Sequence, residues 1–399
     1  MQFRVVAKMI INMTTKFHIF NPEHDSALAL ESGIYTPKPQ IQQFAKDLST
    51  LPLWYSDEED KVILPEISDQ EWLNSVGNII PNIKDKIAST DEYKHFQAPK
   101  RLMPWGIDNT VCRLTSTTQI DGENADDVIK RTKILSSREQ TQDVLTRLKE
   151  KGLFDGFVSQ KIDTVDKLRN IHKEFGKIVV KAPWSSSGRG VLFIDELDEK
   201  EAKRIGKIIE SQGFVMAESF FEKEIDFAIE FEDIDGQWQF AGYSLFSTDE
   251  HGAYKQNLLA SDEFLKHEIC RHADADRLDK IVEFYCQYFQ GKSSELRGNK
   301  IIGVDMMAGN GRIHPCVEIN VRHTMGIVAR RLYDKYIEPG KTGYYAIIRQ
   351  NTTDDLRKWN AEQTQAFPST ISGGRIFQGF VSLTPIEEKT VFQAYVVVE

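Results

Sequence analysis

Residues 301–320 contain the pattern that most constrains the fold of this chain. Two apolar runs, 301–308 and 312–320, flank the tripeptide Gly309-Asn310-Gly311. Glycine and asparagine accept the positive φ angles of a tight turn, so the segment predicts an antiparallel β-hairpin. At least part of the chain is therefore expected to form an antiparallel sheet.

Three oxygen-bearing side chains interrupt these two apolar strands. Asp305 lies in the first strand, while Glu318 and Asn320 lie two residues apart in the second and so share one face of the sheet. Antiparallel pairing can bring Asp305 opposite them. Carboxylate and amide oxygens on one face suit Mg²⁺, which completes its shell with water and substrate phosphates. The hairpin therefore predicts a magnesium site of Asp305, Glu318 and Asn320.

Two alternatives to a magnesium site stay open. A solvated sheet face often carries acids, but the neighbours Val304 and Ile319 are apolar, and a buried acid needs a partner. A structural salt bridge to Arg312 or Arg322 would supply that partner without a metal ion.

The segment 181–191, with the sequence KAPWSSSGRGV, predicts a phosphate-binding loop. Backbone N–H groups approach a triphosphate closely only where the loop residues are small. The small residues of this loop are Ser185, Ser186, Ser187, Gly188 and Gly190. Lys181 ends the preceding strand and can reach a phosphate oxygen, and Arg189 can add a second positive charge. The segment is not a Walker A motif, because it lacks the GK[ST] ending and a following helix. An ordinary flexible hairpin loop is the alternative.

The rest of the chain alternates strand and helix patterns. With 399 residues it is too long for one compact core, which favours two or three lobes. A strand at 17–20, a polar turn and a helix-like stretch from residue 26 open an α/β unit. Further strands are predicted at 62–64, 177–181, 191–194, 214–218, 224–232, 238–246 and 391–398. Helices are predicted at 136–151, with a capping box of Ser136 and Glu139, and at 164–175, 196–211, 274–289 and from residue 326.

Composition narrows the classes of function. The formal net charge of −10 argues against a general nucleic-acid surface, which needs clustered Lys and Arg. No apolar run approaches the length of a membrane span, and residues 1–12 make a poor signal peptide. The four cysteines are scattered without a CxxC pair. We therefore expect a cytoplasmic protein with free thiols and with neither membrane nor nucleic acid as a partner.

The loop and the hairpin, in this order, resemble the ATP-grasp superfamily. Strand 214–218 and the residues after it are similar to the family segment that holds adenine through backbone groups. The residues that the resemblance assigns to this segment are Glu218, Phe220 and Phe221. An acid at the position of Glu224 commonly takes the ribose hydroxyls, and Lys255 lies in a stretch similar to the loop whose Lys approaches the γ-phosphate. The resemblance covers about residues 130–330.

Some positions depart from the family pattern. Many amino-acid ligases of the superfamily place an Arg two residues before the metal-binding Asp, to stabilise an oxyanion, and Gly303 stands there in this chain. Arg322 resembles the Arg after the Glu-x-Asn motif of biotin-carboxylase-like members and is expected to take over this role. Lys133 is the candidate for the first ATP-binding Lys, although its surroundings match the family poorly.

Candidate substrate residues lie outside the nucleotide motifs. Glu23 and His24 follow the first strand, where open α/β sheets bind ligands, while Asp25 is expected to cap the next helix. His323 directly follows the predicted metal strand, although a lone His is more often structural. We retain Glu23, His24 and His323 as substrate candidates.

The resemblance implies an α/β and α+β chain with the ATP-grasp fold. An N-terminal α/β pre-domain (14–125) is expected before two α+β lobes that clasp ATP, a central lobe (126–217) and a C-terminal lobe with a tail extension (218–399). ATP and Mg²⁺ are the implied cofactors.

The implied activity is an ATP-dependent ligase that joins a small-molecule carboxylate to an amine, or to a similar nucleophile, through an acyl-phosphate. Three alternatives stay open: an ATP-grasp kinase that leaves phosphate on its substrate, a nucleotide-binding protein without catalysis, and an unrelated α+β protein. The oligomeric state is also open, with a homodimer as one alternative.

Overall fold

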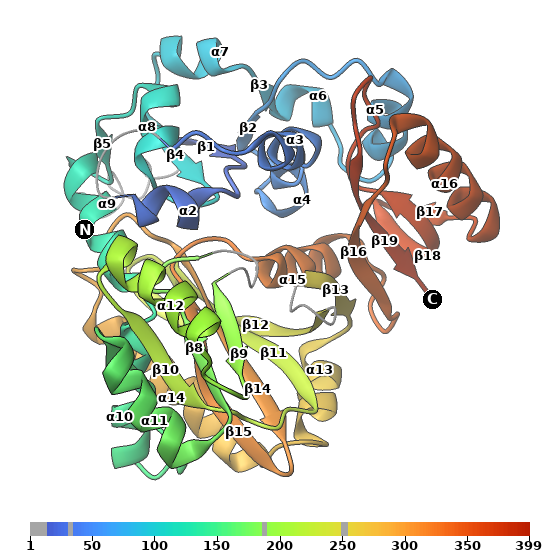
Figure 1. The fold of residues 1–399 in the computed structure, drawn as a ribbon. Helices are drawn as coiled ribbons and strands as arrows, with labels where there is room; N and C mark the ends of the chain where they lie inside the picture. Colours follow the sequence, from blue (N-terminus) through green and yellow to red (C-terminus); the bar gives the residue numbers. More distant parts are fainter. Residues whose placement is uncertain (1–13, 31–34, 186–189, 249–253) are drawn as a thin grey trace, which may run out of the picture.

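The structure, a computed structural model, describes residues 14–30, 35–185, 190–248 and 254–399. Its described strands form a parallel sheet near the N-terminus, a small antiparallel sheet in the middle of the chain, and a large antiparallel sheet that runs to the C-terminus (Figure 1). Helices pack on all three sheets. The strands β5 (Gln119–Ile120) and β6 (Glu123–Asn124) pair with each other as a separate two-stranded ribbon. This arrangement confirms the mixed α/β and α+β architecture that the sequence predicts.

The N-terminal sheet has only parallel pairings among its described strands. Its order is β3 (Ile87–Ala88), β2 (Lys61–Ile63), β1 (Thr15–Ile19) and β4 (Lys100–Pro104). The helices of this region are α2 (His24–Ala29), α3 (Pro39–Asp47), α4 (Pro52–Tyr55), α5 (Gln70–Gly77), α6 (Ile83–Lys86), α7 (Thr90–His95), α8 (Asn109–Thr115) and α9 (Ala125–Leu135). Phe17 of β1 is fully buried and contacts the rings of Tyr93 and Phe96 edge-on, so an apolar strand centre fixes β1 inside the sheet.

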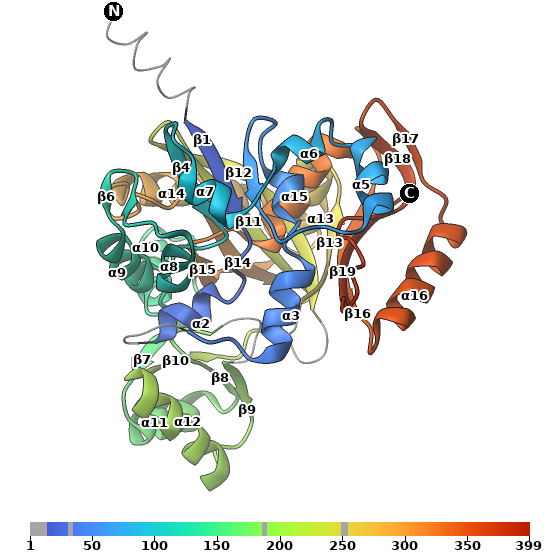
Figure 2. The same ribbon diagram turned by 90° about the horizontal axis from the view of Figure 1, so that it is seen from above.

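The small lobe is built on an antiparallel sheet with two helices. The strand order is β7 (Gln160–Ile162), β10 (Val215–Ser219), β8 (Ile178–Lys181) and β9 (Val191–Ile194), and the helices are α11 (Val165–Phe175) and α12 (Glu199–Gln212). Thr164 caps α11 by accepting a hydrogen bond from the N–H of Lys167. Leu168 and Ile205 bring the two helices onto a compact apolar core. This lobe projects from the rest of the molecule (Figure 2).

The large sheet contains nine described strands, all antiparallel. Its order is β15 (Arg312–Asn320), β14 (Ile301–Gly309), β11 (Ile225–Ile234), β12 (Gln237–Thr248), β13 (Tyr254–Leu259), β16 (Gly343–Arg349), β19 (Phe392–Val398), β18 (Arg375–Ser382) and β17 (Thr370–Ser372). Helices α10 (Gln140–Glu150), α13 (Asp262–Cys270) and α14 (Ala275–Gly291) bury the apolar face of β11, β14 and β15. The opposite face of these strands is therefore left to line a cleft.

The C-terminal tail extends the large sheet and shares a core with the N-terminal region. The tail consists of β16 to β19 with α16 (Thr353–Ala366), and it includes the strand predicted at 391–398. Trp54 of α4 is fully buried and donates a hydrogen bond to the carbonyl of Leu383 at 2.7 Å. Asp47 at the end of α3 accepts hydrogen bonds from the N–H groups of Val391 and Phe392. The tail is thus part of the body of the protein.

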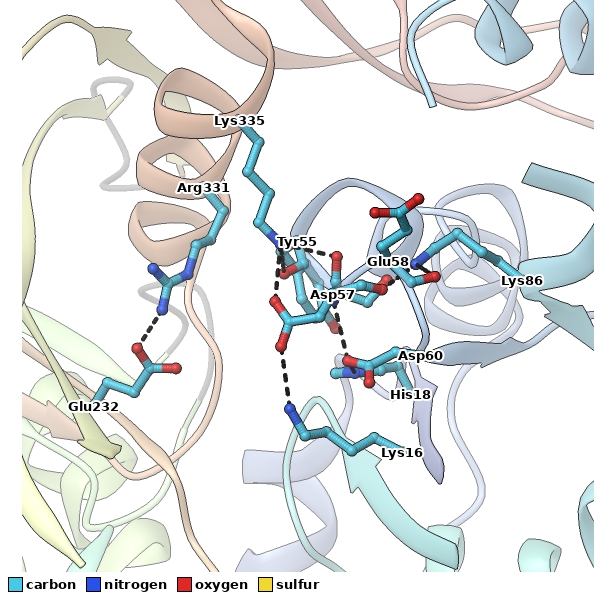
Figure 3. Close-up of polar contacts among 11 residues, drawn as sticks. Lys16, His18, Tyr55, Asp57, Glu58, Asp60, Lys86, Glu232, Arg331 and Lys335 are labelled. Atoms are coloured by element: carbon cyan, nitrogen blue, oxygen red, sulfur yellow. Dashed lines mark hydrogen bonds and ion pairs between the residues drawn. The ribbon is translucent and has the colours of Figure 1, made fainter. Parts of the chain in front are cut away.

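Helix α15 (Met325–Tyr336) joins the large sheet to the N-terminal region (Figure 1). On one side Arg331 pairs with Glu232 of β11, and on the other Lys335 Nζ lies 3.2 Å from Asp57 Oδ1 (Figure 3). Asp57 also pairs with Lys16, at 3.1 Å. These contacts fix α15 over the large sheet.

Two local predictions were wrong. Ser136 does not open a capping box: its N–H closes the last turn of α9 on the Thr132 carbonyl, and α10 begins at Gln140 without a side-chain cap. Asp25 does not cap α2, because the helix begins at His24 and the Asp25 carboxylate is bonded to Arg322. In both cases a tertiary or neighbouring partner outweighs the local signal. Within the described ranges, no helix is long and apolar enough to cross a membrane.

Candidate active site

A cleft of about 1040 Å³ lies between the small lobe, the large sheet and the N-terminal region. We call the part between β8–β10 and the hairpin β14–β15 the lobe half. We call the part around the first turn of α15 the helix half; Glu230, Ser244, Asn257, Thr324 and Gly326 define it. The cleft volume reaches the upper end of the range for small-molecule sites, about 300–1,000 Å³, so it can hold a nucleotide together with a second small molecule.

The hairpin presents the three predicted oxygen ligands to this cleft. Asp305 pairs directly with Glu318, Asn320 pairs with Gly303, and all three oxygen-bearing side chains line the lobe half. Burial, together with the Glu318 carboxylate, raises the pKa of Asp305 to about 7. Two facing, half-buried carboxylates favour a divalent cation, which would offset their repulsion. The donor set therefore fits Mg²⁺.

The cation would need further ligands. Among the described residues, no three His, Cys, Asp or Glu side chains come together as a metal cluster, so the hairpin offers two carboxylates and one amide. Asn320 Oδ1 already accepts a hydrogen bond from Arg322 at 2.8 Å and keeps one further lone pair. Phosphate oxygens and water would complete the shell, as is usual for Mg²⁺.

Arg138 connects the predicted phosphate loop to the predicted metal site. Its guanidinium donates to Glu318 Oε2 at 2.8 Å, to Ser185 Oγ at 2.5 Å and to the carbonyl of Ala182 at 2.8 Å. The side chain is buried and lines the cleft. Arg138 was missed at the level of sequence, because the predicted capping box placed it in the first turn of a helix.

Lys181 is held at the same place by a second ion pair. Its Nζ lies 2.5 Å from Glu218 Oε1, with both side chains buried, and 3.3 Å from the carbonyl of Val317 in the hairpin. The strand before the loop therefore lies against the hairpin that carries the predicted metal ligands. Gly190 closes the loop tightly, since a Cβ there would collide with Ser185 Oγ. Ser186, Ser187, Gly188 and Arg189 lie outside the described residues.

Arg322 is paired with Asp25 from the N-terminal region. The two groups lie 2.9 Å apart, and Arg322 also donates to the carbonyl of His323. Burial alone would lower the pKa of Arg322 and raise that of Asp25, but their mutual attraction reverses both shifts. Arg312 lies over the ring of Phe221 instead, at 5.7 Å. Within the described chain, neither arginine forms the structural salt bridge to the hairpin acids that the sequence left open.

The residues predicted to contact the nucleotide differ in whether they line the cleft. Phe220 and Phe221 line the cleft. Glu224 is exposed, bonds to His272 at 2.5 Å and does not line it, whereas Asp226, two residues further along β11, does. Lys255 is exposed and also lies outside the lining. The assignments of Glu224 and Lys255 stay predictions, and Asp226 is a second candidate for the ribose contact.

Lys133 lies on α9, away from the cleft lining. Its Nζ donates to the carbonyl of Leu30 at 2.8 Å and lies 5.0 Å from the ring centroid of Trp184. Its role as the first ATP-binding Lys stays a prediction. Arg138, unlike Lys133, lines the cleft.

The three substrate candidates differ in position. Glu23 lines the cleft, where burial raises its pKa, and its Oε2 has no hydrogen-bond partner within the described part of the chain. His24 is fully buried and lies 3.6 Å from Asp108, outside the lining. His323 stacks on Tyr55 and Trp105, and burial lowers its pKa to about 3, so it packs as a neutral ring. Only Glu23 of the three reaches the cleft.

Glu230 was also missed, although a signal for it existed. It lies in a predicted strand between Ile229 and Phe231, which is the same pattern of an acid among apolar residues that singled out Asp305. In the structure it is fully buried and lines the helix half of the cleft.

The two α+β lobes, the large antiparallel sheet and the cleft between them are the features of the ATP-grasp fold, and solved structures with this arrangement match the chain. The resemblance drawn from the motifs is therefore confirmed for the fold. A biotin carboxylase from Campylobacter jejuni, solved as a β,γ-ATP complex, is 12% identical over 97% of this chain and 87% of its own, with a TM-score of 0.51. An N5-carboxyaminoimidazole synthetase from Staphylococcus aureus is 11% identical over 97% and 94% of the two chains, with a TM-score of 0.50.

A third solved structure is similar to this chain in fold at equally low sequence identity. The N5-carboxyaminoimidazole synthase from Aspergillus clavatus, in complex with ADP and 5-aminoimidazole ribonucleotide, is 11% identical over 97% of this chain and 94% of its own, with a TM-score of 0.50. At the level of sequence, no protein-family model and no curated protein matches the chain.

Proposed function

We propose that this protein is an ATP-dependent ligase that joins a carboxylate to an amine, or to a similar nucleophile, through an acyl-phosphate. The observation that carries the proposal is the meeting of Lys181 and Arg138 with Asp305 and Glu318 in one cleft. Two cations and two facing carboxylates that line one cleft suit a magnesium nucleotide, because the cations offset phosphate charge and the acids would hold the metal.

Each residue of this wall has a distinct part in the proposal. Lys181 and Arg138 would contact phosphate oxygens, and both are positioned by hydrogen bonds before ligand arrives. Asp305, Glu318 and Asn320 would hold Mg²⁺, which when bound neutralises charge on the transferring phosphoryl group. Phe220 and Phe221 supply apolar surface for the base. Pre-positioned charges of this kind stabilise a developing charge without reorganisation.

Arg322 would stabilise the tetrahedral intermediate. Its bonds to Asp25, Asn320 and the His323 carbonyl fix the guanidinium beside the metal ligands. A guanidinium held in this way can face an oxyanion that forms when the nucleophile attacks the acyl carbon. Asp25 is then a positioning residue for Arg322.

The solved structures support this proposal through their ligands. Two of those with the same fold were solved with an adenine nucleotide, and one of them also holds 5-aminoimidazole ribonucleotide. The four free thiols of this chain fit the reducing cytoplasm, where we place the protein.

The test is a screen of amino acids and metabolite carboxylates with MgATP and hydroxylamine. Hydroxylamine captures an acyl-phosphate as a hydroxamate, so a ligase yields ADP, phosphate and hydroxamate together. A kinase would instead leave the phosphate on its substrate, and a non-catalytic binder would release no ADP; either result would refute the ligase proposal.

The variant Glu318→Gln gives the matched test of the metal site. We expect turnover of ATP to fall about 1,000-fold, because the loss of a metal ligand removes several kcal/mol of charge stabilisation. Glu232→Gln is the control, since Glu232 belongs to the same sheet, pairs with Arg331 and does not line the cleft (Figure 3). Unchanged turnover in Glu318→Gln, with a normal melting curve, would refute the metal assignment.

A further inference from the structure

Glu230 carries a buried carboxyl group that is only half satisfied. It is fully buried, and its Oε1 accepts a hydrogen bond from Thr324 Oγ1 at 2.8 Å. Its Oε2 has no hydrogen-bond partner within the described residues. Burying a carboxyl oxygen without a partner is costly, and Glu230 is a lining residue of the cleft, so its unpartnered oxygen points to a ligand.

Two glycines make room for this carboxyl group. A Cβ at Gly326 would collide with Glu230 Oε1, and a Cβ at Gly303 would lie 2.8 Å from Glu230 Oε2 and 2.6 Å from Thr324 Cγ2. The space beside Gly303 is filled by Glu230 and Thr324, so the backbone is shaped around the acid.

The neighbours of Glu230 offer hydroxyl and amide oxygens. Ser244 Oγ accepts a bond from Asn257 Nδ2 at 2.6 Å, and Tyr254 donates to Asn257 Oδ1 at 2.7 Å. All four side chains line the cleft. A site with a carboxylate and hydroxyl oxygens suits a ligand that donates hydrogen bonds, and it suits an anion poorly.

Glu230 also lies close to the predicted chemistry. It is paired with Gly303 across β11 and β14, and Ala228, two residues away on the same face, is paired with Asp305. The charges of Asp305 and Arg322 both act on the Glu230 carboxyl group. A ligand at Glu230 Oε2 would therefore lie next to the magnesium ligands and next to Arg322.

We propose that Glu230 Oε2 binds the nitrogen of the amine substrate and takes its proton, which makes the helix half the amine subsite. This assignment rests on the ligase function proposed above. In the step, the amine lone pair forms the new C–N bond, the C–O bond to phosphate breaks with its electron pair leaving on phosphate, and one N–H proton passes to the ionised form of the Glu230 carboxyl group. Thr324 and Ser244 orient the carboxyl group and the amine.

The electrostatic setting supports this role. Burial, with a smaller contribution from Asp305, raises the pKa of Glu230 to about 8. A carboxylate with a raised pKa is a stronger base than an exposed one, and so it is better matched to an ammonium proton. The first turn of α15 adds the positive end of a helix dipole beside it, which favours the ionised form while the amine is bound.

The test compares two acyl acceptors in the variant Glu230→Gln. Hydroxylamine is neutral near pH 7 and strongly nucleophilic, so it captures the acyl-phosphate with little need for a base. Ammonium chloride and methylamine are the amine probes, used with the best carboxylate of the screen. We expect amide formation from these probes to fall about 100-fold, while hydroxamate formation stays within about threefold of the wild type.

The control variant is again Glu232→Gln, which removes an acid from the same strand and should leave both rates unchanged. Equal losses of amide and hydroxamate formation in Glu230→Gln, or a loss of neither, would overturn the assignment and leave Glu230 a structural partner of Thr324. Absence of hydroxamate in the wild type with every carboxylate would instead refute the ligase function itself. The two failures are therefore distinguishable.

Discussion

The two halves of the cleft satisfy their buried charges in different ways. In the lobe half each buried cation has an acid beside it: Lys181 lies 2.5 Å from Glu218, and Arg138 lies 2.8 Å from Glu318. In the helix half Glu230 is buried with one oxygen bonded to Thr324 and the other without a partner in the described chain. Both halves are parts of one cleft, and strands of the large sheet line both of them.

This difference separates two kinds of buried charged residue. Some are paired with another side chain in the free protein, whereas Glu230 would find the partner of its second oxygen only in a ligand. A buried ion pair keeps its geometry in the free protein, because each member compensates the other. A buried acid with an unbonded oxygen is unfavourable in the free protein, so its presence is better explained by what binds there. From this difference we make three predictions about stability, in order of decreasing expected effect.

The largest effect is expected in the lobe half, from the variant Lys181→Met. Removal of one partner leaves Glu218 buried and uncompensated, so the free energy of unfolding should fall by about 3–5 kcal/mol. The double variant Lys181→Met with Glu218→Met should recover most of that loss, since two apolar side chains replace the pair. Urea denaturation followed by circular dichroism measures all three proteins. A loss below about 1 kcal/mol in the single variant would show that the pair is not coupled.

A smaller effect is expected in the helix half, from Gly326→Ala. The new Cβ would meet Glu230 Oε1 and Ser244 Oγ, so overpacking should lower the free energy of unfolding by about 1–3 kcal/mol. The control is Gly206→Ala in α12, where the nearest atom, Val165 Cγ2, lies 3.9 Å from the new Cβ. That change should stabilise the protein by roughly 0.5–1 kcal/mol through helix propensity. Equal effects of the two substitutions would contradict the tight packing around Glu230.

The third prediction is a pH dependence of stability that belongs to Glu230, and its effect is the smallest of the three only when it is taken over a single pH unit. Its pKa is about 8 in the folded protein and near the ordinary Glu value when unfolded, so between these values the folded state binds the extra proton. Stability from this group is complete below the unfolded pKa and falls as pH rises toward 8, by at most about 1.4 kcal/mol per pH unit.

The variant Glu230→Gln lacks this proton, so it should gain stability relative to the wild type as pH rises from about 5 to 8. Thermal or urea unfolding of both proteins across that range measures the difference, in which the titration of Asp305 cancels to first order. A constant difference at every pH would show that the Glu230 carboxyl group is not perturbed by burial.

The features predicted correctly from sequence depend on short stretches of chain. The hairpin was placed to within a residue, as β14 (Ile301–Gly309) and β15 (Arg312–Asn320), because its turn and apolar strands are adjacent in sequence. The turn alone would pair Asp305 with Cys316, and a register shift between Asp305 and Met307 brings Asp305 opposite Glu318 instead. The position of Lys181 at the end of an apolar strand is confirmed in the same way, because β8 ends at Lys181, while its contact with phosphate stays a prediction.

The features that were missed depend on distant parts of the chain. Arg138 is positioned by a hydrogen bond to Glu318, 180 positions away in the sequence, and Glu230 by a hydrogen bond from Thr324, 94 positions away. Nothing in the local sequence of either residue encodes these contacts. The short elements between 64 and 124 were equally hard to predict, because strands of two to five residues are held by the sheet around them and carry little periodicity.

The most direct measurement is a crystal structure of the protein with Mn²⁺ and a non-hydrolysable ATP analogue, in which the anomalous signal of manganese locates the metal. We predict a peak about 2.1 Å from oxygens of Asp305 and Glu318, with the triphosphate against Lys181 and Arg138. A metal peak or a nucleotide bound anywhere else in the molecule would contradict the proposed site.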